Sequence, residues 1–473
     1  MSLTLKPYGE YKASGLSWIR RLPAHWKTER AKWLFERMQR PARPEDDVVT
    51  CFRDGMVTLR KNRRMEGFTE SLKEIGYQGV REGDLVIHAM DAFAGAIGVS
   101  DSDGKSTPVY AVCAPRTTLD IKYYARVVRE MARSQWIAAL ARGIRERSTD
   151  FRYENFANEW LPLPLLDEQA SIAAFLGGFE KRIGKLIRAK RRVIGLLNEQ
   201  RQAIIHRAVT RGIGVGVRLK SSGIDRVGDI PAHWELRRAK QVCRAIIDCK
   251  NRTPDMVEGG DFTVVRTSNV RGGRFISAGS YPTDRRNYEI WTQRGAPGKG
   301  DVFFTREAPA GEACLVPDIE NLCMGQRMMY FRPDVRQLDS AFLLYSIYGP
   351  LVRTYVEQVT NGSTVGHLRL GDVYALPILW CPVEEQRAIV AHVPKCTEAM
   401  DRAIDRTARE ISLVREYRAR LIADVVTGKL DVRSVDLAQI EDTDMPEELD
   451  EVETNGIEDS IELDAAKTFE GEV

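Results

Sequence analysis

Leu22-Pro23-Ala24-His25-Trp26, followed by Arg30-Ala31-Lys32, recurs 208 positions later as Ile230-Pro231-Ala232-His233-Trp234, followed by Arg238-Ala239-Lys240. Three further matches follow in the same order, each 217 positions apart: Gly83-Asp84-Leu85-Val86 with Gly300-Asp301-Val302-Phe303, Asp167-Glu168-Gln169 with Glu384-Glu385-Gln386, and Val209-Thr210 with Val426-Thr427. Four ordered matches at nearly one offset indicate an internal duplication. Two similar units tend to pack about a pseudo-twofold axis. Such a molecule suits a partner with its own near-twofold symmetry, and duplex DNA is the obvious one.

Length and composition limit the class of protein. The 473 residues are too many for one hydrophobic core, so we expect two globular units joined by helices. No stretch approaches the roughly 18 apolar residues of a membrane helix, and the first residues lack a signal-peptide core; we therefore expect a cytoplasmic protein without membrane contact. Eight cysteines without a C-x-x-C pair predict reduced thiols rather than a disulfide framework or a zinc site.

The formal charge is distributed unevenly. Residues 434–473 hold fifteen Asp or Glu against one Lys, so residues 1–433 carry +17 although the whole chain carries +3. A basic body with an acidic tail is typical of a polyanion binder whose tail is solvated and disordered. A basic surface kept only for solubility is the alternative interpretation.

Two segments have the spacing of long helices. The first carries Ile172, Leu176, Phe179, Ile183, Leu186, Val193, Leu197 and Ile204, and the second Ile389, Val393, Met400, Ile404, Ile411, Val414, Leu421 and Val425. These steps of three and four predict heptad-like stripes through which the two helices pack on each other. Gly177-Gly178 and Pro394 predict a short helix, a break and then a helix of about 30 residues in each segment.

Each globular unit precedes one long helix. Residues 1–165 and 216–383 mix short apolar runs, such as 84–88, 262–266 and 301–305, with amphipathic stretches at 120–142 and 340–359. This mixture predicts an α/β (α+β) fold with two similar mixed domains. The tryptophan of each Pro-Ala-His-Trp motif is interpreted as a structural anchor near the base of a helix.

Polar loops at parallel places in both units are the candidate DNA contacts. Arg offers a bidentate fork for guanine or phosphate, Asn offers the donor and acceptor that read adenine, and small hydroxyl residues suit phosphate oxygens. Each cluster alone has an ordinary solvated loop as its alternative, but the recurrence favours function. The candidates are Arg60, Lys61, Arg63, Arg64, His88, Arg145 and Arg147 in the first unit, and Arg266, Ser268, Asn269, Arg271, Arg274, Thr305, Arg306, Arg327, Ser363 and Thr364 in the second.

Catalytic motifs are missing. The chain has no Asn-Pro dipeptide, hence no amino-methyltransferase motif, and no Walker A loop. The Asp-x-Lys triplets at 103–105 and 248–250 resemble nuclease sites but have no obvious partner carboxylate, and the six histidines have no metal-binding spacing. A self-sufficient methyltransferase or nuclease is therefore disfavoured, and we expect no catalytic residue, metal or cofactor on this chain.

Several of these motifs together match a known family. The repeated Pro-Ala-His-Trp, Leu161-Pro162-Leu163-Pro164 and Leu376-Pro377-Ile378, the Glu-Gln helix starts and the Val-Thr helix ends resemble the specificity subunit of type I restriction-modification systems over residues 10–432. The acidic tail departs from that pattern.

The resemblance implies the following organisation. Residues 1–165 and 216–383 are target-recognition domains, each reading one half of a split double-stranded DNA sequence. Residues 166–215 and 384–432 are antiparallel spacer helices in a pseudo-twofold arrangement, and 433–473 is the tail. The helices dock two methyltransferase subunits, through which restriction subunits join; S-adenosylmethionine, ATP and Mg are expected on those partners.

The residues chosen for the spacer and its docking surface are Glu168, Gln169, Ile183, Leu197, Glu385, Gln386, Met400 and Val414. The alternative function is a helical scaffold that binds nucleic acid without sequence preference.

Overall fold

The computed structural model describes residues 5–63, 75–140, 150–360 and 366–436. Contacts divide these residues into two compact units. Unit 1 takes the described residues up to 191 and from 409 onward, and unit 2 takes those from 192 to 408. The domain limits expected from the sequence stay a prediction, as does the pseudo-twofold arrangement.

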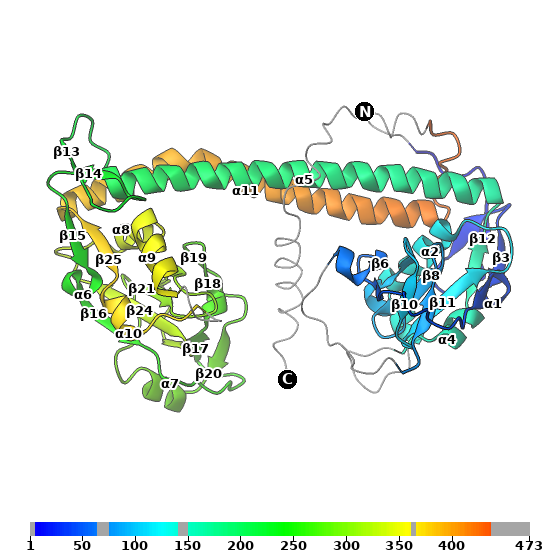
Figure 1. Ribbon diagram of the computed structural model, residues 1–473, viewed down its shortest axis with the longest axis horizontal. Coiled ribbons are helices and arrows are strands. Elements are labelled where there is room, and N and C mark those ends of the chain that lie inside the picture. The colour runs from blue at the N-terminus through cyan, green and yellow to red at the C-terminus, as the bar shows by residue number, and fades with distance from the viewer. Residues whose placement is uncertain (1–4, 64–74, 141–149, 361–365, 437–473) are drawn as a thin grey trace. The chain divides into compact units, whose positions relative to one another are not determined.

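Unit 1 is built on a four-stranded antiparallel sheet in the order β4-β11-β8-β9; β8 and β11 are labelled in Figure 1. The helix α2 (Ile121–Arg133) packs against β9 and buries one face of tyrosines and valines. Its first turn is capped by the Asp120 carboxylate, which accepts from the Tyr123 amide. The strands are β4 (Phe35–Arg37), β8 (Leu85–His88), β9 (Ile97–Val99) and β11 (Tyr110–Pro115).

Unit 2 repeats this sheet in the order β16-β24-β21-β22, again antiparallel throughout. The helix α8 (Ser340–Ile347) follows, and Asp339 caps it as Asp120 caps α2. β21 is buried on both faces, since Val302 and Phe304 join one apolar cluster and Phe303 joins another. The strands are β16 (Cys243–Asp248), β21 (Val302–Thr305), β22 (Ala313–Leu315) and β24 (Met328–Pro333).

Smaller paired strands attach each unit to its long helices. The residues of the Pro-Ala-His-Trp motif lie between two such pairs in both units. Unit 1 pairs β1 (Tyr11–Ala13) with β2 (Arg21–Pro23) and β3 (Lys27–Arg30) with β12 (Trp160–Leu163). Unit 2 pairs β13 (Leu219–Ser221) with β14 (Asp229–Pro231) and β15 (Glu235–Arg238) with β25 (Pro377–Trp380).

The repeated Gly-Asp motif begins the third strand of each sheet. Gly83 and Gly300 have positive φ of 87° and 93°, a conformation that favours glycine. Asp84 accepts from the Arg81 amide at 2.7 Å, and Asp301 accepts from the Gly298 amide at 3.0 Å. The motif therefore recurs because it makes the turn into the strand.

The inserts between these shared elements differ. Residues 38–84 of unit 1 contain β5 (Val49–Cys51), β6 (Val57–Leu59), η1 (Arg60–Asn62) and β7 (Gln78–Val80). Residues 249–301 of unit 2 contain β17 (Phe262–Val265), η3 (Thr267–Asn269), β18 (Val270–Arg271), β19 (Arg274–Phe275), β20 (Tyr281–Thr283) and α7 (Arg285–Trp291). β7 pairs antiparallel with β10 (Gly104–Ser106), whereas β17 pairs parallel with β23 (Leu322–Met324). The duplication thus preserves the sheet and not the inserts.

The remaining short elements connect the strands and helices of each unit. In unit 1 they are α1 (Ala31–Leu34), η2 (Ala92–Ala94), α3 (Trp136–Leu140) and α4 (Tyr153–Asn158). In unit 2 they are α6 (Ala239–Val242), α9 (Pro350–Thr360) and α10 (Leu370–Tyr374). The helical stretches expected at 120–142 and 340–359 are thus each divided in two.

The two long helices are continuous, so the predicted break is wrong. α5 runs over Leu166–Arg211 and α11 over Val383–Val426, with Pro394 inside it. A glycine costs a helix about 1 kcal/mol and a proline about 3 kcal/mol. Burial of the neighbouring Phe175, Phe179 and Val393 offsets this cost.

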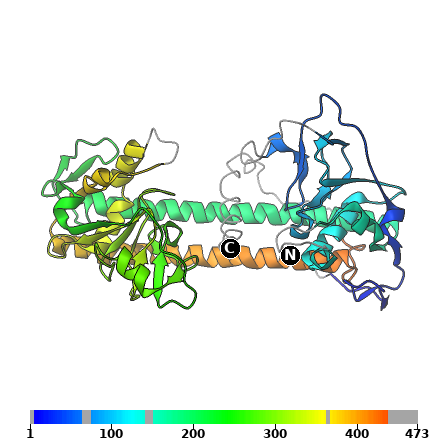
Figure 2. The ribbon, with the colours of Figure 1, turned by 90° about the horizontal axis from the view of Figure 1, so that it is seen from below.

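The helices pack antiparallel, as expected, within unit 1 (Figure 2). Glu180 of α5 contacts Arg418 of α11 at 3.2 Å, and Lys190 of α5 contacts Glu410 of α11 at 2.6 Å. Residue numbers therefore increase along α5 in the direction in which they decrease along α11. The predicted seam is wrong at Leu186, which is 40% exposed, while Ile187 is buried. A straight helix has 3.6 residues per turn, so its buried face drifts away from a strict heptad pattern.

Candidate nucleic-acid interface

The repeated tryptophans anchor each domain to the helices, which confirms their structural interpretation. Trp234 is fully buried, and its indole N–H donates to Glu385 Oε1 at 3.1 Å. A Cβ at Gly212, just after α5, would lie 3.3 Å from its ring. In unit 1, Trp26 is also fully buried, and a Cβ at Gly428, just after α11, would lie 3.0 Å from it.

The repeated histidines and glutamates complete this joint. His25 Nε2 lies 3.0 Å from Glu168 Oε2, and His233 Nε2 lies 2.8 Å from Glu385 Oε2. The Tyr8 hydroxyl donates to Glu168 Oε1 at 2.6 Å, and burial, followed by that hydrogen bond, raises the pKa of Tyr8 far above its usual range. The glutamates chosen as docking residues are thus engaged inside their own units.

The repeated glutamines are buried as well. Gln169 Oε1 accepts from the Asp120 amide at 3.0 Å, and its Nε2 donates to the Pro164 carbonyl at 3.0 Å. In unit 2, Gln386 Oε1 accepts from the Asp339 amide at 2.8 Å, and its Nε2 donates to the Cys381 carbonyl at 2.7 Å. Both join the start of a long helix to the capped start of a domain helix. Both glutamines lie at the helix starts, as expected, but because they are fully buried neither offers a surface to a docking partner.

The other residues chosen on the helices lie in or beside the seam. Ile183 is buried, and Leu197, Met400 and Val414 are half-buried. The apolar side chains that face solvent are different ones, which sequence periodicity assigned to the seam or passed over. They are Leu186, Val193 and Leu196 on α5 and Leu413 and Tyr417 on α11.

The insert of unit 2 presents the exposed polar side chains that the sequence predicted. Arg266 and Ser268 are exposed around η3, with the Arg266 guanidinium 5.8 Å from the centre of the Tyr281 ring. Arg271 and Arg274 are exposed on the β18–β19 hairpin, and Arg274 lies 3.7 Å from Asp401 of α11. These four side chains remain candidate DNA contacts.

Asn269 is a correction. Its side chain is fully buried; Oδ1 accepts from the Arg266 amide at 2.7 Å, and Nδ2 donates to the carbonyls of Ile276 and Ala278. Both amide protons are already donated and the amide oxygen is closed off from solvent, so the side chain can offer neither a donor nor an acceptor to adenine. Asn269 instead shapes the loop that carries Arg266 and Ser268.

Thr305 and Arg306 are also corrected to structural roles. Thr305 is fully buried and accepts from the Glu312 amide at 3.0 Å. Arg306 is 15% exposed, donating to Asp248 at 2.7 Å and to the Leu368 carbonyl at 3.0 Å. Arg327 remains accessible at 47% but pairs with Glu307 at 2.9 Å.

The candidates of the unit 1 insert surround η1. Lys61 is 57% exposed and pairs with Asp47 at 2.5 Å. Arg63 lies over the Phe52 ring at 4.4 Å and pairs with Asp54 at 2.6 Å. Arg60 is half-buried, and its Nε donates to Thr50 Oγ1 at 3.3 Å. Lys61 is thus exposed, whereas Arg60 and Arg63 are half-buried; all three stay predicted contacts.

His88 is mostly enclosed. Its ring lies 4.6 Å from that of Tyr110, and Nδ1 accepts from the Asp91 amide at 3.0 Å. Burial lowers the pKa of His88, opposed by the nearby Asp91 carboxylate. The side chain thus favours the neutral form, which supplies no charge for phosphate. Five further candidates, Arg64, Arg145, Arg147, Ser363 and Thr364, lie outside the described residues.

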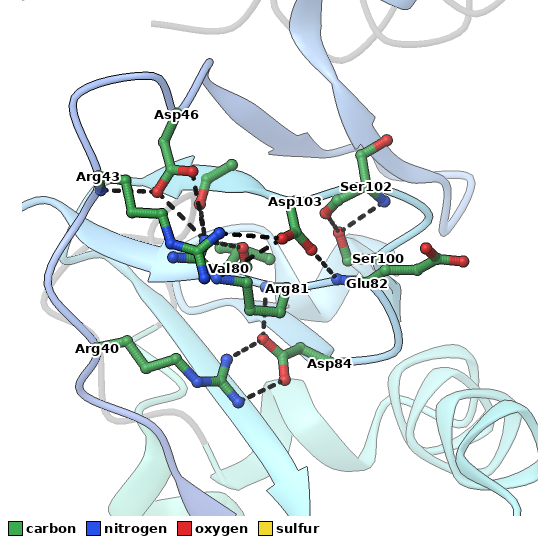
Figure 3. A network of polar contacts seen from close by, with 11 residues as sticks. Arg40, Arg43, Asp46, Val80, Arg81, Glu82, Asp84, Ser100, Ser102 and Asp103 are labelled. Atoms are coloured by element: carbon green, nitrogen blue, oxygen red, sulfur yellow. Dashed lines mark hydrogen bonds and ion pairs between the residues drawn. The ribbon is translucent and has the colours of Figure 1, made fainter.

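An ion-pair network that the sequence did not reveal fixes the unit 1 insert to its sheet (Figure 3). Arg81 contacts Asp46 at 3.2 Å and Asp103 at 3.8 Å, Arg43 contacts Asp103 at 3.5 Å, and Arg40 pairs with Asp84. Asp103 belongs to one Asp-x-Lys triplet, and Arg306 engages Asp248 of the other. Within the described ranges no three His, Cys, Asp or Glu residues come together as metal ligands. The carboxylates of both triplets are therefore parts of structural pairs.

All eight cysteines are free. Burial raises the pKa of seven of them, among them Cys314 and Cys323, each to about 12. None of the described helices is both long and apolar enough to cross a membrane.

Comparison with known proteins finds relatives of one kind. The chain is 23% identical over 283 residues to a type I restriction enzyme MjaX specificity subunit of Methanocaldococcus jannaschii, covering 58% of this chain and 60% of that protein. It is 23% identical over 288 residues to the MjaVIII specificity subunit of the same organism, covering 59% and 64%. The matched part thus spans less than two thirds of either relative. No family model matches the chain.

A solved structure shares the fold. It is described as "Structural basis underlying complex assembly and conformational transition of the type I R-M system", and one of its chains superposes with a TM-score of 0.58 at 17% identity, covering 86% of this chain and 99% of that one. The mixed helix-and-sheet fold predicted from the sequence is confirmed. The curated homologues of this chain are specificity subunits of type I restriction enzymes.

Proposed function

We propose that this chain is the sequence-specific DNA-recognition subunit of a type I restriction-modification complex. Each unit reads one half of a bipartite target in double-stranded DNA. The helices α5 and α11 determine the gap between the halves and dock methyltransferase subunits, through which restriction subunits join. The chain itself is not an enzyme. S-adenosylmethionine, ATP and Mg are bound by the partner subunits.

The observation that carries this proposal is the contrast between a repeated sheet and unlike inserts. The strand order, the Gly-Asp turn and the tryptophan joint recur in both units. Residues 38–84 and 249–301 occupy the same place in the chain order and have different elements. Two equivalent scaffolds with different polar surfaces are suited to reading two different DNA sequences.

Phosphate contacts supply most of the affinity in such an interface, and a few side chains select bases. In unit 2 we assign base selection to Arg266 and Ser268 and backbone contacts to Arg271 and Arg274. An arginine held beside an aromatic ring loses less conformational freedom on binding, which suits Arg266 to bidentate contact with guanine.

The exposed apolar side chains of the helices support the docking role. Leu186, Leu413 and Tyr417 are between 40% and 64% exposed in unit 1. Contiguous exposed apolar patches mark contacts with other proteins, and we assign these three side chains to such a docking patch. A scaffold without sequence preference has no need of two unlike inserts, so it is not favoured.

A methylome tests the proposal. The chain is co-expressed with the methyltransferase encoded beside it in a host without adenine methylation, and modified adenines are mapped by single-molecule sequencing. One split motif with two specific halves around a fixed gap is expected. A soluble complex that modifies no motif, or a motif without a gap, would contradict the assignment.

The two halves are then assigned with matched variants. Arg266→Ala is expected to relax one half of the motif, and Lys61→Ala or Arg63→Ala only the other. Arg285→Ala, on the exposed face of α7, is the control because its side chain is 80% exposed and paired within its own helix.

A further inference from the structure

One face of α5 carries cations without acids. Between Glu180 and Glu199 the sequence has seven Lys or Arg and no Asp or Glu. Ile183 and Ile187 are buried at the seam with α11. At 100° per residue, Lys181, Lys185 and Arg188 lie on the side of the helix away from these isoleucines, with Arg182 beside them. We call Lys181, Arg182 and Lys185 the basic stripe.

The nearest carboxylates of the two helices are already engaged. Glu180 pairs with Arg126 of α2 at 2.8 Å and with Arg418 of α11 at 3.2 Å. Glu410 pairs with Lys190 at 2.6 Å. Within the part of the chain that the structure describes, Lys181, Arg182 and Lys185 form no ion pair. This charge is available to a polyanion.

The same chain supplies a polyanion that is covalently attached to unit 1. Residues 437–473 contain fourteen Asp or Glu and one Lys, and eight of these acids lie between Glu441 and Glu453. The described chain leading into this segment lies at the start of α5, since Arg433 Nε is 3.9 Å from Glu168 Oε1. The acidic segment therefore begins close to the helix that carries the basic stripe.

The acidic segment is long enough to reach the basic stripe. From Glu168, the basic stripe begins 13 residues and ends 17 residues along α5, which is roughly 20 to 26 Å at 1.5 Å per residue. From Arg433, the residues 441–453 are 8 to 20 positions away; an extended chain spans up to about 3.4 Å per residue, so their reach is roughly 27 to 68 Å.

We propose that residues 441–453 bind the basic stripe of α5 within the same molecule. Opposite charges attract, and the short tether gives the acidic segment an effective concentration in the millimolar range. Such a contact is screened by salt, because Lys181 is exposed and Arg182 and Lys185 are only half-buried. Through the proposed function, it has a consequence: the acidic segment competes with DNA phosphates for the basic surface, and so weakens non-specific binding more than specific binding.

Carbodiimide cross-linking of the full-length chain tests the contact without DNA. This reagent joins a lysine amine to a carboxylate only where the two touch. Links from Lys181 and Lys185 to residues 441–453 are expected at about 50 mM salt and lost at about 500 mM. In the test variant, the Asp and Glu residues of 441–453 are replaced by Asn and Gln. In the control variant, those of 458–472 are replaced in the same way. Only the first variant should remove the links. Links spread over lysines of both units, or loss with the control variant, would overturn the proposal.

A second measurement uses binding of a non-specific duplex, followed by fluorescence anisotropy. Neutralising 441–453 should tighten binding about tenfold at low salt, with little change at high salt. If the neutralised variant binds as the original chain does, the acidic segment does not compete with duplex for the basic stripe, and the proposal is wrong. The absence of a methylated motif would count against the proposed function while leaving the cross-links intact.

Discussion

The buried glutamines offer the sharpest test of how the domains join the helices. Gln386→Ala removes the partner of the Asp339 amide and of the Cys381 carbonyl. Gln169→Ala removes the partner of the Asp120 amide and of the Pro164 carbonyl in unit 1. Each substitution therefore leaves one buried backbone amide and one buried backbone carbonyl without this hydrogen-bond partner.

The size of the effect follows from these groups. A buried donor or acceptor left without a partner costs about 1–3 kcal/mol, so two of them cost about 3 kcal/mol in the free energy of unfolding. Each substitution also loosens the N-cap of the domain helix, because Asp120 and Asp339 cap α2 and α8. The effect should be confined to one unit in each variant.

Urea denaturation measures the loss, and hydrogen exchange shows which unit opens. The control is Gln200→Ala, an exposed glutamine on α5, which should change stability by less than about 0.5 kcal/mol. If Gln386→Ala were as stable as this control while binding of the methyltransferase fell, the glutamine would be a docking residue and the structural reasoning would fail.

Three further outcomes are expected. Arg266→Ala should relax half of the DNA motif without changing stability, whereas Asn269→Ala should lower the stability of unit 2 by about 2–3 kcal/mol because three buried hydrogen bonds are lost; equal stability of the two variants in urea would contradict this. Burial lowers the pKa of His88, so its contribution to stability is present above about pH 6.5 and lost as the pH falls through the folded pKa; His88→Gln should flatten the acid side of the stability profile. Trp234→Phe should cost about 1 kcal/mol more than Trp26→Phe in thermal unfolding, because Trp234 donates to Glu385 whereas Trp26 Nε1 has no hydrogen-bond partner in the described part of the chain.

Much of the framework could be predicted from repeated residues. The Gly-Asp pairs predicted the strands β8 and β21, because a left-handed glycine and a turn-capping carboxylate act locally. The buried tryptophans were predicted from their repetition beside the helix motifs. Continuity of α5 and α11 was not predictable from Gly177 or Pro394 alone, since packing of side chains that are distant in sequence offsets the local cost.

The candidate interface was predicted less completely. Residue type alone placed Asn269 with Arg266 and Ser268 as readers of bases. The same polar side chain can contact a ligand at the surface or make structural hydrogen bonds in the interior. Only its surroundings distinguish these two roles. Arg306 and Thr305 were misassigned for the same reason, and the network of Arg40, Arg43 and Arg81 went unnoticed because its partners are separated in sequence.

The sequence by itself determined that the chain is duplicated, that two mixed domains alternate with two long helices, and that a basic body continues into an acidic segment. These properties follow from local patterns and from composition. The tertiary structure alone decided which polar residues are exposed and which make structural hydrogen bonds in the interior, and which helix side chains form the seam. Burial and hydrogen-bond partnership depend on groups brought together from distant positions, and no local pattern contains that information.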